Sequence, residues 1–132
     1  MTPLHPDAHP MPPERLLGKN GGTLLDLLAY AYLENDRPEK AAVLLAALET
    51  LGLADARQRT ALAWAQLRSG EPASALDTLD QVALQAEPGM AFHLVRAQTL
   101  VALGRNAEAQ AAMQVYIKLR ADGRNAPGSR SL

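Results

Sequence analysis

The sequence predicts an all-α fold in which three helical hairpins stack into a short right-handed solenoid, and three observations support it. Small residues recur at matching positions 34 residues apart, at Ala41, Ala75 and Ala109, a period typical of helical repeat arrays. A turn with a polar or flexible residue lies five residues ahead of each of these alanines. The apolar residues are rich in alanine, the strongest helix former, and the long β-branched runs that would indicate a sheet are missing.

Composition is consistent with one domain and excludes several function classes. The 132 residues carry 13 basic and 14 acidic side chains, for a net charge of −1, with both signs interspersed. A nucleic-acid interface needs clustered Lys and Arg, so we do not expect one. The absence of cysteine excludes disulfides and fits a reducing cytosol. We expect neither a membrane span nor a secretion signal, because no apolar run approaches about 20 residues and no basic start precedes an apolar core.

Residues 1–21 form a proline-rich N-terminal arm that we predict to be disordered. Five prolines lie within its first 13 positions, and proline at this density opposes helix formation and favours extended chain. His5 and His9 lie in this arm, but the flexible spacer between them gives no metal-binding geometry. Residues 14–19 can form one helical turn, which the Asn-Gly-Gly segment at 20–22 is expected to break as a hinge.

The first repeat is expected to span residues 22–55 and to open with a helix near residues 23–34. Thr23 and Asp26 have the spacing of a capping box at its start, although Glu or Gln is usual at the second position. The apolar residues of this helix recur at helical spacing. They are Leu24, Leu25, Leu27, Leu28, Ala31 and Tyr32.

The second helix of this repeat is expected near residues 38–51. Asp36 and Glu39 can cap its N-terminus, and Pro38 is tolerated in the first turn because its missing N–H would have no helical partner. Gly52 is expected to end the helix.

Repeats 2 and 3 are expected at residues 56–89 and 90–121. The second repeat has the same kind of turn and helix-start residues as the first, with Gly70 in the turn and Pro72 early in the following helix. Residues 122–132 are rich in Gly, Pro, Ser and Arg, so we predict a disordered tail.

Each hairpin has one apolar face that it cannot bury alone, and stacking about three hairpins gives a continuous core. The period and the small residues at the helix crossings together identify a tetratricopeptide-type array. These small residues are Ala29, Ala63 and Ala97 in the first helices and Ala41, Ala75 and Ala109 in the second helices. Four polar residues fall at positions that are normally apolar, namely Arg59, Gln66, His93 and Arg96.

The first helices of such an array line its concave side, and apolar residues left over after the hairpin cores are filled indicate a partner-binding groove. Aromatic anchors and a polar rim suit a peptide or helix. Trp64 and Tyr30 could instead pack as ordinary core between neighbouring repeats. The residues expected to bind a protein partner are Asp26, Tyr30, Leu33, Arg57, Trp64, Leu67, Arg68, Leu94, Gln98 and Val101.

The sequence gives little support for an enzyme. It has no nucleophile beside a base motif and no paired metal ligands at helical spacing. We therefore expect no catalytic residue, no metal and no cofactor, and interpret His93 as a polar residue at a helix edge.

Three segments resemble the small chaperones of bacterial type III secretion, and most closely the YscY (SctY) family of assembly chaperones. They are residues 27–48, residues 92–98 with the Arg-Ala-Gln sequence, and residues 115–120. The resemblance covers roughly residues 24–120. The chain departs from the usual repeat in having alanine for the first-helix glycine in all three repeats.

This resemblance implies a cytoplasmic bacterial chaperone that keeps an early export substrate, SctX-like, soluble and delivers it to the export gate protein, SctV-like. It also implies peripheral attachment at the inner membrane through the secretion apparatus. Alternatives are a generic tetratricopeptide scaffold, or a chaperone for a needle subunit or a translocator. A self-assembling scaffold is a further possibility, because the last helix can expose Val115 and Leu119 and no separate polar capping helix follows.

Overall fold

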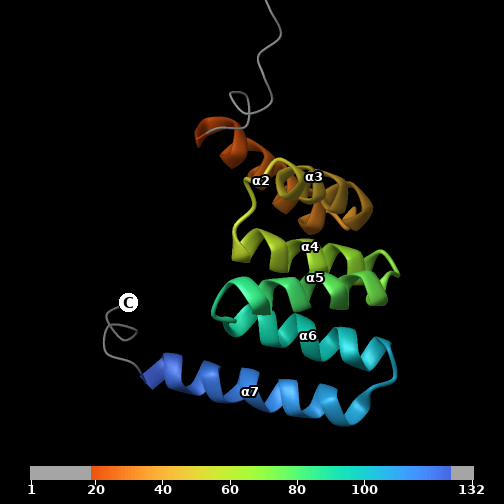
Figure 1. The fold of residues 1–132 in the computed structure, drawn as a ribbon, viewed down its shortest axis with the longest axis vertical. Helices are drawn as coiled ribbons and strands as arrows, with labels where there is room; N and C mark the ends of the chain where they lie inside the picture. Colours follow the sequence, from red (N-terminus) through yellow and green to blue (C-terminus); the bar gives the residue numbers. More distant parts are fainter. Residues whose placement is uncertain (1–18, 126–132) are drawn as a thin grey trace, which may run out of the picture.

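The computed structural model describes the backbone of residues 19–125 and the side chains of residues 25–123. Every regular element of this part of the chain is a helix and none is a strand, which confirms the predicted all-α fold (Figure 1). The helices are α2 (Lys19–Glu34), α3 (Pro38–Thr50), α4 (Ala56–Arg68), α5 (Pro72–Gln85), α6 (Met90–Ala102) and α7 (Asn106–Asn125).

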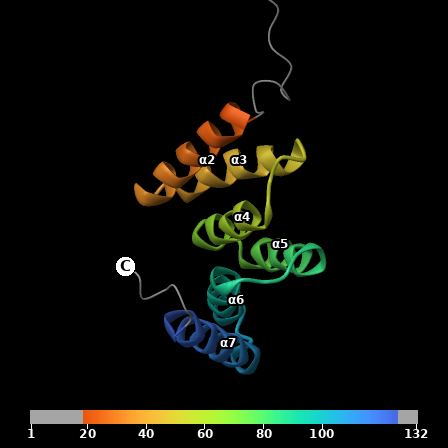
Figure 2. The ribbon, with the colours of Figure 1, turned by 90° about the vertical axis from the view of Figure 1, so that its left-hand side faces the viewer.

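Consecutive helices pair into the three predicted hairpins, α2 with α3, α4 with α5, and α6 with α7. The hairpins stack along the long axis of the molecule, so that α2–α3 and α6–α7 lie at opposite ends (Figures 1 and 2). Each new hairpin begins by packing its first helix on the preceding second helix, α4 on α3 and α6 on α5, and α6 also contacts α4. The structure is therefore a short helical repeat stack.

Each hairpin turn contains one residue in the left-handed region. The φ angles are +58° at Asp36, +84° at Gly70 and +77° at Gly104, positions that are 34 residues apart. Glycine adopts this conformation without the steric cost that a Cβ imposes, and aspartate is among the residues that tolerate it. The constant spacing of the turns within the sequence thus corresponds to a repeated backbone conformation.

The core consists of tightly packed helix crossings built around small residues. All six predicted alanines, at positions 29, 63 and 97 and at positions 41, 75 and 109, are at most 4% exposed. Leucines fill the space beside them, with Leu45, Leu48 and Leu79 almost completely buried. The burial of all six alanines agrees with the predicted close approach of the paired helices.

The N-terminal boundary of α2 differs from the prediction. The helix begins at Lys19 and continues through the Asn-Gly-Gly segment that was expected to break it. Glycine inside a helix costs only about 1 kcal/mol, so two glycines near the start do not end a helix that packing stabilises. Thr23 and Asp26 consequently lie within the helix, and the predicted capping box at its start is wrong.

The caps of the next helices also differ. The N-cap residue of α3 is Arg37, which makes no side-chain cap, because a guanidinium has no acceptor for a backbone N–H. The carboxylate of Asp36 pairs with Arg68 instead. A complete capping box instead begins α4, where Asp55 accepts from the Gln58 backbone N–H at 2.7 Å and the Gln58 side chain accepts from Asp55 N–H at 2.9 Å. This Asp-x-x-Gln signal was present in the sequence and was missed.

The predicted arm and tail fall mostly outside the described residues. Residues 19–21 belong to α2 and residues 122–125 belong to α7, so the helical part of the chain is longer at both ends than predicted. The remainder of both segments, including His5 and His9, lies outside the described residues.

The four polar residues at apolar positions are partly buried, and two of them, Arg59 and Arg96, form ion pairs across the junctions between hairpins. Arg59 of α4 pairs with Glu49 of α3, and Arg96 of α6 pairs with Asp80 of α5 at 3.4 Å. The Gln66 side chain accepts a hydrogen bond from the Thr78 hydroxyl at 2.7 Å, and His93 contacts the Phe92 ring edge to face, with centroids 5.1 Å apart. The junctions between hairpins are thus closed by polar pairs as well as by apolar packing.

Candidate functional site

The candidate site lies on the surface formed by α2, α4 and α6, which we call the first-helix surface. Each of these helices is the first of its hairpin, and the hairpins succeed one another along the stack with their helix directions turned (Figure 2). Two ion pairs join α2 and its turn to α4. Arg57 binds Asp26 at 2.6 Å, and Arg68 binds Asp36.

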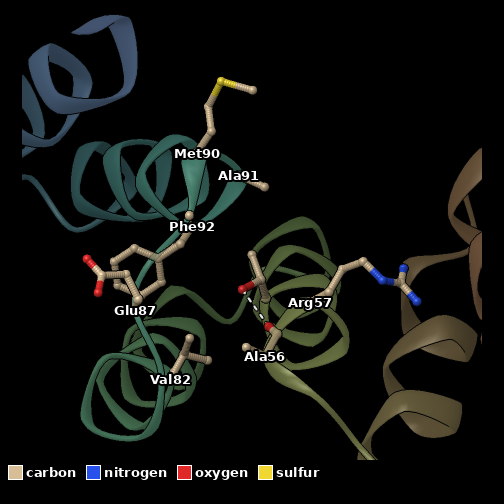
Figure 3. Close-up of a pocket in the computed structure, with 9 residues that line it drawn as sticks. Ala56, Arg57, Val82, Glu87, Met90, Ala91 and Phe92 are labelled. Carbon is tan, nitrogen blue, oxygen red and sulfur yellow. Dashed lines mark hydrogen bonds between the residues drawn. The ribbon is translucent and has the colours of Figure 1, made fainter. Parts of the chain in front are cut away.

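A pocket of about 300 Å³ opens between the N-terminal halves of α4 and α6. Figure 3 shows Ala91 on the side of α6 nearer α4, the Phe92 ring between α6 and the helix that carries Val82, and Met90 projecting from α6 away from Phe92 and Val82. Phe92 and Val82 are buried, whereas Met90 is 45% exposed. The Thr60 hydroxyl, which lines the pocket, donates to the Ala56 carbonyl at 2.9 Å, so most of the free pocket wall is apolar.

Arg57 lies at the edge of this pocket, but its guanidinium points away from it toward α2 (Figure 3). The hydrogen bond to Asp26 raises the pKa of Arg57 above its ordinary value. The charge is therefore engaged within the chain. Exposed ion pairs of this kind are worth at most about 1 kcal/mol, so a partner carboxylate could compete for Arg57 at little cost.

Arg68 and Trp64 form a second unit on α4. The Arg68 guanidinium lies over the Trp64 ring, 5.7 Å from its centroid, while it also pairs with Asp36. Trp64 itself is half-buried and packs with Leu67 against the core cluster of Ala63, Ala75 and Leu79. The alternative interpretation of Trp64 as core packing is therefore correct for part of its surface.

The remaining predicted residues are divided between core and surface. Tyr30 is 63% exposed, and its interaction with Glu34 raises the pKa of the phenol, so Tyr30 is not core. Leu33 is half-buried against the α2–α3 core, and Leu94 is also half-buried. The structure thus brings Asp26 to Arg57 and Trp64 to Arg68, whereas it does not gather all ten predicted residues at one point.

Gln98 and Val101 lie apart from the α4–α6 pocket. Both line a separate apolar groove between α6 and α7, and both are exposed. Contact of these and the other predicted residues with a partner stays a prediction.

Met90 and Phe92 are the residues of this surface that the sequence did not assign to a partner. Phe92 was assigned to the core, which is correct, but it also lines the pocket. Met90 stands at the first position of α6, directly after Gly89. An exposed methionine at a helix start, where it cannot reach the hairpin core, was the available signal, and methionine is common at adaptable binding surfaces.

Within residues 25–123, no group of three or more His, Cys, Asp or Glu side chains is arranged to hold a metal ion. None of the described helices combines the length and the apolar character that a membrane span requires.

Two segments, residues 56–81 and 90–114, match the sequence profile described as tetratricopeptide repeat. They fall on α4–α5 and α6–α7, the hairpins predicted as repeats 2 and 3. No curated protein matches the chain. Tetratricopeptide repeats generally act as non-enzymatic scaffolds that bind other proteins on an extended surface, so the match supports a protein partner and a protein-interaction role.

Proposed function

We propose that the chain binds a protein partner on the first-helix surface, with the pocket between α4 and α6 as the anchor point. The observation that carries this proposal is that Met90 is 45% exposed and lines a mainly apolar pocket, on the helices that match the tetratricopeptide repeat. Tyr30 adds an exposed aromatic ring on the same surface. Exposed apolar side chains beside a pocket are typical of partner sites.

Burial of apolar side chains supplies the attraction in this proposal. Complete burial of one Leu, Met or Phe side chain contributes about 1.5–3 kcal/mol, so one partner residue in the pocket and one over Met90 would form a small hot spot. The ion pairs of Arg57 and Arg68 lie beside this region. By exchanging partners, these arginines orient a bound protein and fix its position along the surface, and they add little to the net affinity.

We further propose that the partner is an export substrate of a type III secretion system, SctX-like, on the basis of the resemblance to the YscY (SctY) chaperones. In this role the chain covers an apolar helical segment of the substrate in the cytoplasm. The covered segment stays soluble until the complex reaches an SctV-like export gate. A needle subunit or a translocator is the alternative client.

The test is a titration of the purified full chain with the SctX-like protein of the same organism, followed by fluorescence anisotropy of the labelled SctX-like protein. Met90→Glu adds a charge to the pocket lining and should weaken binding at least tenfold, because an unpaired carboxylate would be desolvated on association. Leu84→Glu is the matched control, since Leu84 is 86% exposed on α5, outside the first-helix surface, and should leave binding unchanged.

Equal affinity of Met90→Glu and the wild type, with unchanged helicity, would remove the α4–α6 pocket from the binding site. Absence of any binding by the wild-type chain would reject the SctX-like client. Titration with the needle subunit and the translocators would then distinguish another secretion client from a scaffold unrelated to secretion.

A further inference from the structure

The two ends of the helix stack carry faces that the interior of the same stack buries. α2 lies at one end and α7 at the other (Figure 1). Because the period is 34 residues, every residue at an end has counterparts 34 or 68 positions away in the interior. Comparison of each end residue with its counterparts shows what would cover that face.

The N-terminal face is the side of α2 that carries Leu27, Leu28 and Ala31. Leu27 is 60% exposed and Leu28 is 42% exposed. Their counterparts in α4 pack into the core that α4 forms with the α2–α3 hairpin. These counterparts are Ala61, Leu62 and Ala65. Among the described residues, no helix packs on this face of α2, which corresponds to the apolar face that α4 uses to dock on the hairpin before it.

The C-terminal groove lies between α6 and α7 and has a volume of about 330 Å³. Ala97, Val101, Ala109 and Met113 form its apolar lining, and Val101 is 60% exposed. The counterparts of these residues in the first hairpin belong to the apolar cluster that also contains Leu62 and Ala65 of α4. They are Ala29, Leu33, Ala41 and Leu45. The groove thus corresponds to the surface on which the first helix of the next hairpin packs at an interior junction.

Polar residues at the junctions indicate that the two ends fit each other. The α3–α4 junction pairs Glu49 with Arg59. The end counterpart of Arg59 is Leu25 on α2, and that of Glu49 is Ile117 on α7. Both partners of the ion pair are replaced together by apolar side chains, so the two end faces can meet without burying an unpaired charge.

The second interior pair behaves in the same way. The end counterparts of Arg96 and Asp80, which pair across the α5–α6 junction, are Leu28 and Gln114, neither of which is charged. A junction between the ends would resemble an interior junction in shape and would be more apolar.

We propose that a second copy of this chain docks end to end on the first, with the N-terminal face of one copy in the C-terminal groove of the other. The contact continues the stacking of α4 on α3 and of α6 on α5. Because the two faces differ, the contact is heterologous, and each added copy leaves one free face at either end. This inference does not depend on the proposed partner, since it uses neither Met90 nor the α4–α6 pocket.

Sedimentation equilibrium of the full chain tests the proposal. The apparent mass of the wild type should rise with concentration from 14.1 kDa to twice that value and beyond. Leu28→Glu disables the N-terminal face and Val101→Glu disables the C-terminal groove, and each variant alone should remain monomeric. Both sites are exposed, so both variants should keep the helicity of the wild type.

An equimolar mixture of the two variants gives the sharpest outcome. The Leu28→Glu chain keeps its groove and the Val101→Glu chain keeps its α2 face, so the mixture should form dimers and nothing larger. Leu84→Glu should associate like the wild type. A mixture that stays monomeric, a Leu28→Glu variant that still dimerises, or a wild type at 14.1 kDa at every concentration would each overturn the end-to-end contact.

Discussion

Replacement of Ala75 by leucine tests whether the small residues at the helix crossings set the repeat register. Ala75 is 0% exposed and packs in the cluster that contains Ala63 and Leu79. If the crossing had room, the three added carbons would stabilise the fold by about 2 kcal/mol through burial. The crossing is closed, so leucine must displace its neighbours, and we expect the free energy of unfolding to fall by about 1–3 kcal/mol.

The measurement is urea unfolding followed by circular dichroism, with Ala83→Leu as the matched control. Ala83 lies on the same helix and is exposed, so its replacement should change the free energy of unfolding by no more than about 0.5 kcal/mol. The sign of the difference between the two variants is decisive. A stability gain in Ala75→Leu, or equal midpoints for the two variants, would show that the crossing is not closely packed and would refute the reasoning.

Two further predictions concern polar groups inside the stack. Thr99 is completely buried, and its Oγ1 has no hydrogen-bond partner among the described residues, so Thr99→Val should raise the free energy of unfolding by about 1 kcal/mol. Thr60→Val removes the 2.9 Å bond to the Ala56 carbonyl and should lower the free energy of unfolding. Equal effects of the two substitutions in urea melts would contradict this difference between the two hydroxyls. Burial, with a smaller effect from the Arg96 charge, lowers the pKa of His93, so the unfolded chain binds this proton at a higher pH than the folded chain does. Stability should therefore decrease as the pH falls below about 6.5, and a pH series in which His93→Gln shows the same slope as the wild type would exclude this cause.

The sequence predicted the features that depend on local spacing. The 34-residue period placed the three hairpins, the turn residues and the six buried alanines, because each of these follows from the chain's own repeat. The positive φ at the three turn residues is a finding of the structure, and nothing in the period indicated that Asp36 would direct its carboxylate to Arg68 rather than to the next helix.

The features that depend on distant residues were not predictable in this way. The start of α2 at Lys19 depends on how much the whole helix gains from packing, which outweighs the cost of two glycines. The pairing of Arg57 with Asp26 joins residues 31 positions apart. Both residues were predicted to contact a partner, and in the structure they bind each other. Trp64 is divided between core and surface, which a helical pattern cannot express because it assigns each position to one face.

The α4–α6 pocket is most directly tested by hydrogen–deuterium exchange of the chain alone and in complex with its partner protein. The proposal predicts slower exchange on binding in the first turns of α4 and α6, near Arg57 and Met90, with little change in the middle of α5. Slower exchange confined to the outer side of α3 and α5, with α4 and α6 unchanged, would contradict binding on the first-helix surface.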